Sequence, residues 1–443
     1  MTLKNNKDTM KRILSLSVVV MMCVLTPMAQ TEFMEKVKSI AKVTDVEKLE
    51  TTVYPEKYVM MFEHPLDYAH PEKGSFKQRV FVGHVGWDRP TVIVTEGYGG
   101  EREMNPNSVE EISKMLNTNL IFVEYRYFQK SMPSPCNWDY LTVWNSLCDL
   151  HEVTTAFKTL YKRKWLATGI SKGGQTCMFY RAYFPDDVDV SVPYVAPLNK
   201  AVIDGRHEPF LTDKVGNEWE RKTVREFQIE VLKRRPAMEK MLEAFCKEKD
   251  IRFNEGVGMS EVLDMVVLEY SYALWQWGDD VHEIPSLSSS DKVLFDYLVK
   301  KSSPDYFRPD PYFLSFFVQA ARELGYYGYD LKPLKPYLSI KNADDYLCRM
   351  MLPAELKDTK FSNELYKHTV KFLKQNDPKM IYIYGENDPW SSSGVLTWLD
   401  FSKKKNMHLF VDPNGSHRAR IGTLPATQQE VCIRLLKEWL EID

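Results

Sequence analysis

The sequence is poor in cysteine and has neither an excess of basic charge nor an internal repeat. Its 7 cysteines form no C-x-x-C pair, which argues against a metal site, although Cys136 and Cys148 could pair in an oxidising compartment, an alternative that the sequence leaves open. The net charge of −3 gives no electrostatic support to nucleic-acid binding. With 44% hydrophobic and 27% charged residues, the chain has the composition of a soluble globular protein.

The apolar run near the N-terminus is too short to span a membrane. Lys11 and Arg12 precede Ile13 to Leu25, a run of 13 residues, and small residues follow up to Ala29. A spanning helix needs about 20 apolar residues, whereas this pattern is typical of a secretory signal peptide. We predict export to a periplasm or out of the cell, with cleavage near Ala29 and no membrane association afterwards. Cleavage there lowers Lys plus Arg from 58 to 54 and Asp plus Glu from 61 to 60, for a net charge of about −6.

The most informative motif is G-x-S-x-G at residues 169–173. It lies between the apolar run 165–168 and a helix-like segment that Pro185 ends. Strand, G-x-S-x-G and helix together form a nucleophile elbow, which exposes a serine hydroxyl above a sheet. Ser171 is therefore the predicted nucleophile, and the amide of Lys172 at the helix start is a candidate oxyanion donor.

The order of apolar runs predicts an α/β fold of the hydrolase type. Residues 47–88, including Thr51–Tyr54, favour antiparallel strands, and buried-strand runs follow at 90–95, 119–123 and 188–197, with a helical period over 139–161. Long amphipathic stretches then extend to about residue 376, before strands at 379–384 and 406–411 and a closing helix over 426–441. We expect a signal peptide at 1–29, a hydrolase core formed by 30–197 and 377–443, and a helical cap domain at 198–376, which would cover the active site.

Two loops near the C-terminus supply the partners that a nucleophilic serine needs. In this fold the order along the chain is Ser, then Asp or Glu, then His, each after a core strand. Asp388 follows the strand at 379–384, and His417 follows the strand at 406–411. Pro389 fixes the loop directly after Asp388 and favours it over Glu386. Asp412 is a further acidic candidate, but it lies close to His417 in the sequence. The predicted triad is Ser171, Asp388 and His417.

A glycine-rich loop after an early strand is a second candidate for oxyanion binding. Residues 96–100 follow the strand at 90–95, where hydrolases of this architecture place their other oxyanion donor. Tyr98 can donate there through its amide or its hydroxyl, so it joins Lys172 in the predicted oxyanion site.

Several segments together resemble one known family. They are Glu96–Gly99, Val123–Phe128, Trp165–Gly174, Tyr194–Pro197 and the run from Gly385 to Trp390. In this order they resemble the secreted tripeptidyl aminopeptidase family of serine peptidases, which is similar to the prolyl carboxypeptidase and dipeptidyl peptidase II group. The resemblance covers essentially the whole chain after the signal peptide. It implies an α/β-hydrolase core with a helical cap, no cofactor, and release of short peptides, tripeptides in particular, from free N-termini.

An exopeptidase of this kind needs further substrate-binding groups. A free ammonium calls for a carboxylate in the cleft, and Glu96 and Glu124 are candidates because both follow core strands. A structural ion pair, for example between Glu124 and Arg126, is the alternative for both. Trp390, with Trp138, is a candidate wall for the residue at the cleavage point, and core packing is the alternative.

Two other functions remain compatible with the sequence. A carboxylic-ester hydrolase would use the same triad, because fold does not determine the acyl substrate. An exported, non-catalytic binding module would keep the fold without the chemistry. The sequence determines neither the length of the released peptide nor the oligomeric state.

Overall fold

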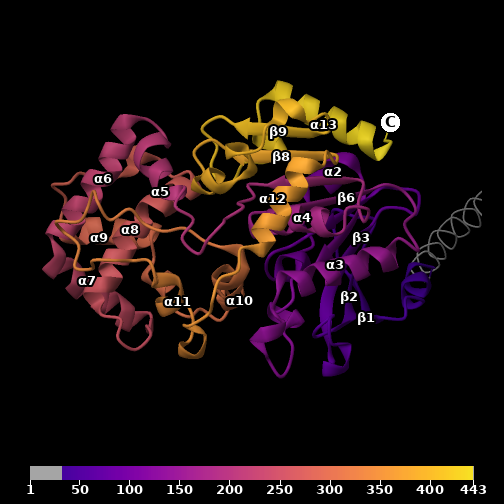
Figure 1. Ribbon diagram of the computed structural model, residues 1–443, viewed down its shortest axis with the longest axis horizontal. Helices are drawn as coiled ribbons and strands as arrows, with labels where there is room; N and C mark the ends of the chain where they lie inside the picture. The colour runs from indigo at the N-terminus through magenta and orange to yellow at the C-terminus, as the bar shows by residue number, and fades with distance from the viewer. Residues whose placement is uncertain (1–31, 443) are drawn as a thin grey trace, which may run out of the picture.

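The computed structural model describes residues 32–442 and contains a single nine-stranded sheet (Figure 1). The predicted cleavage site near Ala29 lies outside the described residues. The strand order is β1-β2-β3-β5-β4-β6-β7-β8-β9. The strands are β1 (Val43–Leu49), β2 (Glu56–Pro65), β3 (Ser75–His84), β4 (Thr91–Val94), β5 (Asn119–Val123), β6 (Trp165–Ile170), β7 (Val190–Tyr194), β8 (Met380–Gly385) and β9 (Met407–Asp412).

The sheet is antiparallel at one side and parallel over the rest. β1, β2, β3 and β5 pair antiparallel in that order, and β5, β4, β6, β7, β8 and β9 are parallel to their neighbours. The central strands β4 to β8 are buried along their length except at Ile170, the last residue of β6, as expected where helices cover both faces. This confirms the predicted α/β-hydrolase core, in which the parallel strands present their carboxyl ends at one edge.

Two helical layers cover the sheet. One face packs against α3 (Val143–Phe157), α4 (Lys172–Tyr183) and α12 (Glu364–Gln375), and the other against α2 (Glu111–Leu116) and α13 (Ala426–Leu440). Neighbouring residues of a strand alternate between the layers, so that Ile93 faces the first and Val92 the second. The sheet is thereby held rigidly beneath the loops that follow its strands.

The segment between β7 and β8 is largely helical, as the amphipathic pattern predicts. Its helices are α5 (His207–Pro209), α6 (Glu218–Lys233), α7 (Arg235–Glu248), α8 (Met259–Trp277), α9 (Asp291–Lys301), α10 (Leu314–Gln319) and α11 (Tyr346–Met350), followed by α12. In Figure 1, α6 to α9 lie together at the end of the molecule away from the sheet. Helix α8, most of whose residues are buried, is central to them, because α6, α7 and α9 all pack against it.

The last helix of this segment returns to the sheet. Leu365 and Leu373 of α12 belong to the same buried cluster as α4, and the His368 ring stacks on Tyr183 at 4.1 Å between ring centroids. The domain boundary predicted at residue 376 groups α12 with the other inserted helices, whereas α12 packs against the core.

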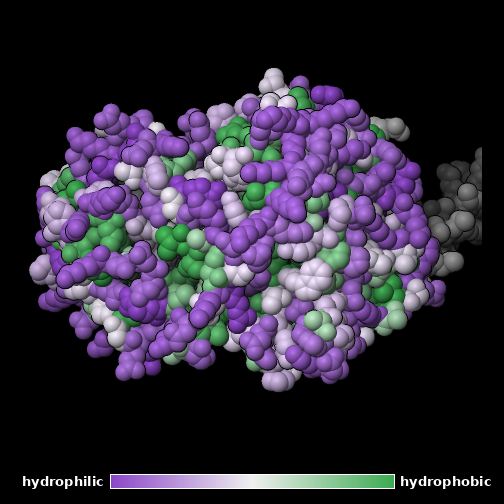
Figure 2. Space-filling view, viewed as in Figure 1, coloured by the Kyte–Doolittle hydropathy of each residue, from purple (hydrophilic) through white to green (hydrophobic). Residues whose placement is uncertain are grey.

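Hydrophilic side chains cover most of the face in view, while apolar side chains show between the α6–α9 region and the sheet region (Figure 2). Among residues 32–442, no helix has the length and apolarity that a bilayer span requires. Cys136 and Cys148, whose pairing the sequence leaves open, are both free, the first exposed and the second buried.

A buried ion pair links the loop after β5 to helix α3. The Arg126 guanidinium donates to both carboxylate oxygens of Asp149 at 2.7 Å, and also to the carbonyls of Leu66 and Tyr140. Both side chains are almost completely buried. The expected alternative, an ion pair between Glu124 and Arg126, is wrong: Arg126 pairs with Asp149, and Glu124 pairs with Arg79.

We expect Arg126→Met to lower the free energy of unfolding by roughly 3–5 kcal/mol, because it removes the guanidinium that neutralises the buried Asp149 carboxylate, and the hydrogen bond from the Tyr68 hydroxyl does not replace that charge. Urea denaturation followed by circular dichroism measures the loss. The control is Lys292→Met, which removes the exposed pair with Asp296 and should cost under about 1 kcal/mol. Equal losses in the two variants would contradict the role given to the buried pair.

Candidate active site

Ser171 lies at the tight turn between β6 and α4. Its backbone has φ 57° and ψ −119°, a conformation that residues other than glycine rarely adopt. The turn requires small neighbours, because a Cβ at Gly169 would lie 2.3 Å from the carbonyl of Gly173. The Ser171 N–H donates to the Tyr194 carbonyl at 3.0 Å, which ties the turn to β7. The structure therefore has the geometry of a nucleophile elbow at this position.

Asp388 and His417 meet on the loops that follow β8 and β9. The His417 Nδ1 lies 2.7 Å from Oδ2 of Asp388, and the other carboxylate oxygen accepts from the Trp390 N–H at 3.1 Å. Asp388 is fully buried, and His417 is 5% exposed. The His417 Nε2, which the bond to Asp388 leaves available, has no hydrogen-bond partner within residues 32–442. An imidazole held in this way can accept a proton at Nε2.

The other acidic candidates near His417 have different partners. Glu386 accepts from the Asn414 N–H at 2.9 Å, and Asp412 accepts from the Thr423 hydroxyl at 2.6 Å. Both bonds shape the loops, and of the three carboxylates only Asp388 is bonded to the imidazole among the described residues.

The helical segment contacts these loops directly. The His417 N–H donates to the carbonyl of Gln276 near the end of α8, at 2.9 Å. On the Asp388 side, the Asn387 side chain accepts from the Gly216 N–H at 3.2 Å. The position of His417 therefore depends on helix α8 as well as on the sheet.

A cavity of about 590 Å³ borders both Ser171 and His417. Ser171 and His417 line it from the sheet side, and residues from α8 and the segment 302–326 line it from the other side. No hydrogen bond joins Ser171 to His417 within the described part of the chain, and such catalytic bonds are often long without substrate. The walls are rich in aromatic side chains, namely Tyr98, Trp277, Tyr306, Phe313, Phe316, Phe317, Tyr326 and Trp390.

The two predicted oxyanion residues lie beside Ser171. Tyr98 lines the cavity, and burial raises the pKa of its hydroxyl above the usual range, while the nearby Ser171 side chain opposes that rise. The Lys172 ammonium group lies beneath the loop, donates to the Gly97 carbonyl at 2.7 Å and faces the Tyr125 ring at 3.3 Å from its centroid. Burial lowers the pKa of Lys172 well below its ordinary value. The side chain of Lys172 therefore supports the glycine-rich loop, and its amide begins α4.

The predicted ammonium-binding carboxylates have different surroundings. Glu96 lines the cavity, but its carboxylate already pairs with Arg102 at 2.9 Å. Glu124 is fully buried outside the cavity lining, pairs with Arg79, and accepts from the Gly100 N–H at 2.7 Å and from the Ser131 hydroxyl at 2.8 Å. The structure therefore brings Glu96, but not Glu124, to the cavity.

The two tryptophans proposed as a substrate wall lie in different places. Trp390 lines the cavity, is 7% exposed, and packs edge-on against the Tyr272 and Tyr327 rings. Trp138 packs against Tyr127 at 5.6 Å between ring centroids and takes no part in the cavity wall. Of these two tryptophans, Trp390 alone lines the cavity.

A carboxylate that the sequence motifs do not indicate lines the cavity from the helical side. Glu269 on α8 is 6% exposed and lines the cavity. Its Oε2 accepts from the hydroxyls of Tyr327 and Tyr329 at 2.9 and 2.7 Å, and burial raises its pKa to about 7. The available signal was its place as the only charged residue in the apolar run 265–277.

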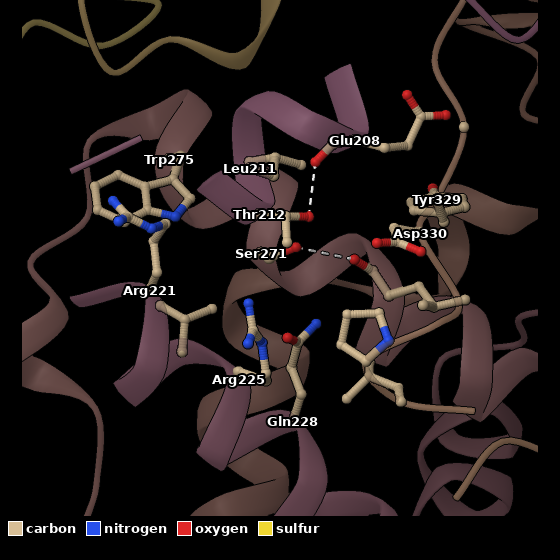
Figure 3. A pocket seen from close by; sticks show the side chains of 15 residues that line it. Glu208, Leu211, Thr212, Arg221, Arg225, Gln228, Ser271, Trp275, Tyr329 and Asp330 are labelled. Carbon is tan, nitrogen blue, oxygen red and sulfur yellow. Dashed lines mark hydrogen bonds between the residues drawn. The ribbon is translucent and has the colours of Figure 1, made fainter. Parts of the chain in front are cut away.

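A smaller cavity of about 60 Å³ lies within the helical region (Figure 3). Glu208, Arg221, Arg225 and Asp330 are among the charged side chains around it (Figure 3). Tyr329, whose hydroxyl donates to Glu269, also lines it. Burial raises the pKa of Glu208, whose Oε2 has no hydrogen-bond partner within the described residues. This cavity shares none of its lining with the cavity beside Ser171.

Metal ligands do not gather in either place: residues 32–442 contain no group of three or more His, Cys, Asp or Glu side chains arranged to hold an ion.

Comparison with known proteins relates the whole chain to peptidases. The family model described as PS-10 peptidase S37 matches residues 27–442. The prolyl tri/tetrapeptidyl aminopeptidase of Streptomyces mobaraensis is 28% identical over 389 residues, which cover 86% of this chain and 79% of the relative. Among solved structures, the proline iminopeptidase of Mycobacterium smegmatis aligns over 90% of this chain and 98% of its own, at 10% identity and a TM-score of 0.36. An α/β fold family hydrolase of Bacillus anthracis aligns over 90% of this chain and 99% of its own, at 11% identity and a TM-score of 0.35.

Proposed function

Because the chain belongs to the PS-10 peptidase S37 family and is a serine peptidase, we propose that it removes short peptides, tripeptides in particular, from the free N-termini of oligopeptides. The observation that carries the proposal is a single cavity lined by both Ser171 and His417, with Asp388 bonded to the imidazole. The name of the Streptomyces mobaraensis relative supports release of three or four residues and a proline at the cleavage point.

The proposed reaction begins with proton transfer from Ser171 to His417. The Ser171 Oγ attacks the scissile carbonyl as its proton moves to Nε2, the nitrogen that the bond to Asp388 leaves free. The carbonyl oxygen becomes an oxyanion, which the Lys172 amide and Tyr98 stabilise. His417 then gives the proton to the amine of the C-terminal fragment, which leaves. The N-terminal short peptide remains bound to Ser171 as an ester through its carbonyl carbon.

A water molecule completes the cycle. His417 takes a proton from the water, the resulting hydroxide attacks the ester carbonyl, and the proton passes to Ser171 as the acyl bond breaks. Asp388 stays ionised throughout and stabilises the imidazolium form of His417. No step uses a metal or an organic cofactor.

The aromatic walls support an apolar residue at the cleavage point. Trp390 and Tyr326 line the cavity together with His417, and aromatic faces pack well against the flat ring of proline. Glu96 lines the cavity on the sheet side and, through its pair with Arg102, shapes the edge of the glycine-rich loop.

We also propose that the mature enzyme acts after export. The support is the basic, apolar and small-residue pattern that ends at Ala29. N-terminal sequencing of the protein recovered from the cell envelope or the medium tests this, since export predicts a new N-terminus near residue 30. Recovery of the intact chain from the cytoplasm would contradict it.

The activity is tested with a matched set of substrates. The set contains tripeptidyl and dipeptidyl amides ending in Pro, Ala or Lys, their N-acetylated forms and a short-chain aryl ester. The proposal predicts fast cleavage of free-amine tripeptides ending in Pro, and slow cleavage after acetylation. Cleavage of the ester alone would point to a carboxylic-ester hydrolase and would discard the aminopeptidase. Cleavage of none would favour a binding module.

A further inference from the structure

We infer that Glu269 binds the α-ammonium group of the peptide substrate and thereby positions the N-terminus opposite Ser171. This inference rests on the proposed aminopeptidase function and adds the residue that recognises the free amine. It replaces Glu96 and Glu124 in that role.

Glu269 is held in place by neighbouring tyrosines. The hydroxyls of Tyr327 and Tyr329 both donate to its Oε2, and within residues 32–442 no donor reaches the other oxygen, Oε1. The side chain lies on the rigid helix α8, the helix whose end also bonds to the backbone of His417. One oxygen is thus fixed and the other is available to a ligand in the cavity. A fixed carboxylate of this kind suits recognition of a compact cation.

The charge of Glu269 has no counterpart in the described part of the chain. The bonds that reach its carboxylate within residues 32–442 come from the hydroxyls of Tyr327 and Tyr329, and no Lys, Arg or His forms an ion pair with it. Burial raises its pKa, and these two hydroxyls oppose the rise. A buried carboxylate is normally paired, because removal of a charge from water is costly. The substrate ammonium would supply the missing positive charge.

Other carboxylates in the same cavity are less suited to the role. Glu96 pairs with Arg102, and Asp310 pairs with Arg308 at 3.3 Å. Asp305 also lines the cavity, but it is only half-buried, and no hydrogen bond from the described residues orients it. Among the cavity's carboxylates, Glu269 alone combines burial, fixed orientation and the absence of a cation.

The charged and titratable groups that face Glu269 are tyrosines. They come from α8, the segment 304–307, the segment 326–329 and α11, namely Tyr272, Tyr306, Tyr326, Tyr327, Tyr329 and Tyr346. Burial raises the pKa of each of these hydroxyls well above 10, so all remain neutral donors near neutral pH. Of this set, Glu269 is the one group whose charge changes near neutrality.

The test compares Glu269→Gln with Glu208→Gln. Glutamine keeps the shape of the side chain and removes its charge. Glu208 is the matched control, because burial also raises its pKa, and because it lines only the smaller cavity of Figure 3. We expect Glu269→Gln to lower kcat/KM for a free-amine tripeptidyl amide by roughly 10–150-fold, the range for loss of a charged hydrogen bond. Glu208→Gln should change it less than threefold.

Two further readouts separate recognition of the amine from a structural effect. Hydrolysis of the N-acetylated tripeptide and of the aryl ester should stay near wild-type rates in Glu269→Gln, because neither substrate carries an ammonium group. In wild type, the ratio of kcat/KM for free-amine over acetylated substrate should rise as the pH increases toward 7, where the Glu269 carboxyl ionises. In Glu269→Gln this ratio should be flat over the same range, because both substrates use the same catalytic residues and only the free-amine substrate needs the Glu269 carboxylate.

Three outcomes would overturn the inference. Equal kcat/KM of Glu269→Gln and wild type on free-amine tripeptides would remove its role while leaving the aminopeptidase function intact. The same loss on acetylated and free-amine substrates would indicate a structural role. A selective loss in Asp305→Asn, with none in Glu269→Gln, would assign the amine to Asp305. Failure of wild type to cleave any free-amine peptide would instead contradict the proposed function, and the inference with it.

Discussion

Ser171→Ala is expected to lower kcat for peptide hydrolysis by about 10⁶-fold, because without the hydroxyl no acyl-enzyme forms. The residual rate would come from the oxyanion site and substrate binding alone. The backbone at this position already has positive φ, which alanine tolerates about as well as serine, so the loss should be purely chemical. Steady-state kinetics on the preferred tripeptidyl amide measures it.

The control for this variant is Ser303→Ala, a serine that lines the same cavity from the helical region. It should reduce kcat by less than tenfold. A fluorophosphonate probe should label wild type and Ser303→Ala but not Ser171→Ala. If Ser171→Ala kept more than about 1% of the wild-type kcat, the assignment of the nucleophile would be wrong, since loss of a triad serine costs far more.

Asp388→Asn should lower kcat by about 10⁴-fold. The carboxylate lies 2.7 Å from Nδ1 of His417, and an amide there favours the tautomer that places the proton on Nε2. In that tautomer His417 cannot accept the proton of Ser171. The shape of the loop should survive, because asparagine can still accept from the Trp390 N–H.

Glu386→Gln and Asp412→Asn serve as matched controls for Asp388→Asn. Their carboxylates bond to Asn414 and Thr423 on the same pair of loops, without contact to the imidazole. Each should reduce kcat by less than about tenfold. A larger loss in Glu386→Gln than in Asp388→Asn would transfer the orienting role to Glu386.

The core and the triad positions could be anticipated because their signals are local. β6 and the elbow are encoded by a continuous stretch in which glycine is required at 169 by a 2.3 Å approach to another backbone. β8 is an apolar run buried by both helical layers, and β9 is a partly buried, mostly apolar run at the sheet edge, so their carboxyl ends and the following loops could be located from the sequence. The bond between Asp388 and His417 then follows from adjacent parallel strands.

Other features depend on contacts that the sequence does not display. Thr51–Tyr54 has the composition of a strand, but the Thr51 hydroxyl accepts from the N–H groups of Val53 and Tyr54 at 3.1 Å and forms a turn instead. Glu124 follows core strand β5, but its carboxylate forms a buried ion pair with Arg79 from β3 and does not line the cavity. Tyr327 and Tyr329, which hold Glu269, are about 60 residues from it, so their contact with Glu269 arises only on folding.

The most direct measurement of the central claim is mass spectrometry of the products formed from an unblocked peptide of about ten residues with proline at position three. Aminopeptidase activity on Ser171 predicts the N-terminal tripeptide and its complementary fragment as the first products, with neither formed from the acetylated peptide or by Ser171→Ala. Fragments cut at internal sites from both the free and the acetylated peptide would contradict the account, because they would show an endopeptidase that does not recognise the N-terminus.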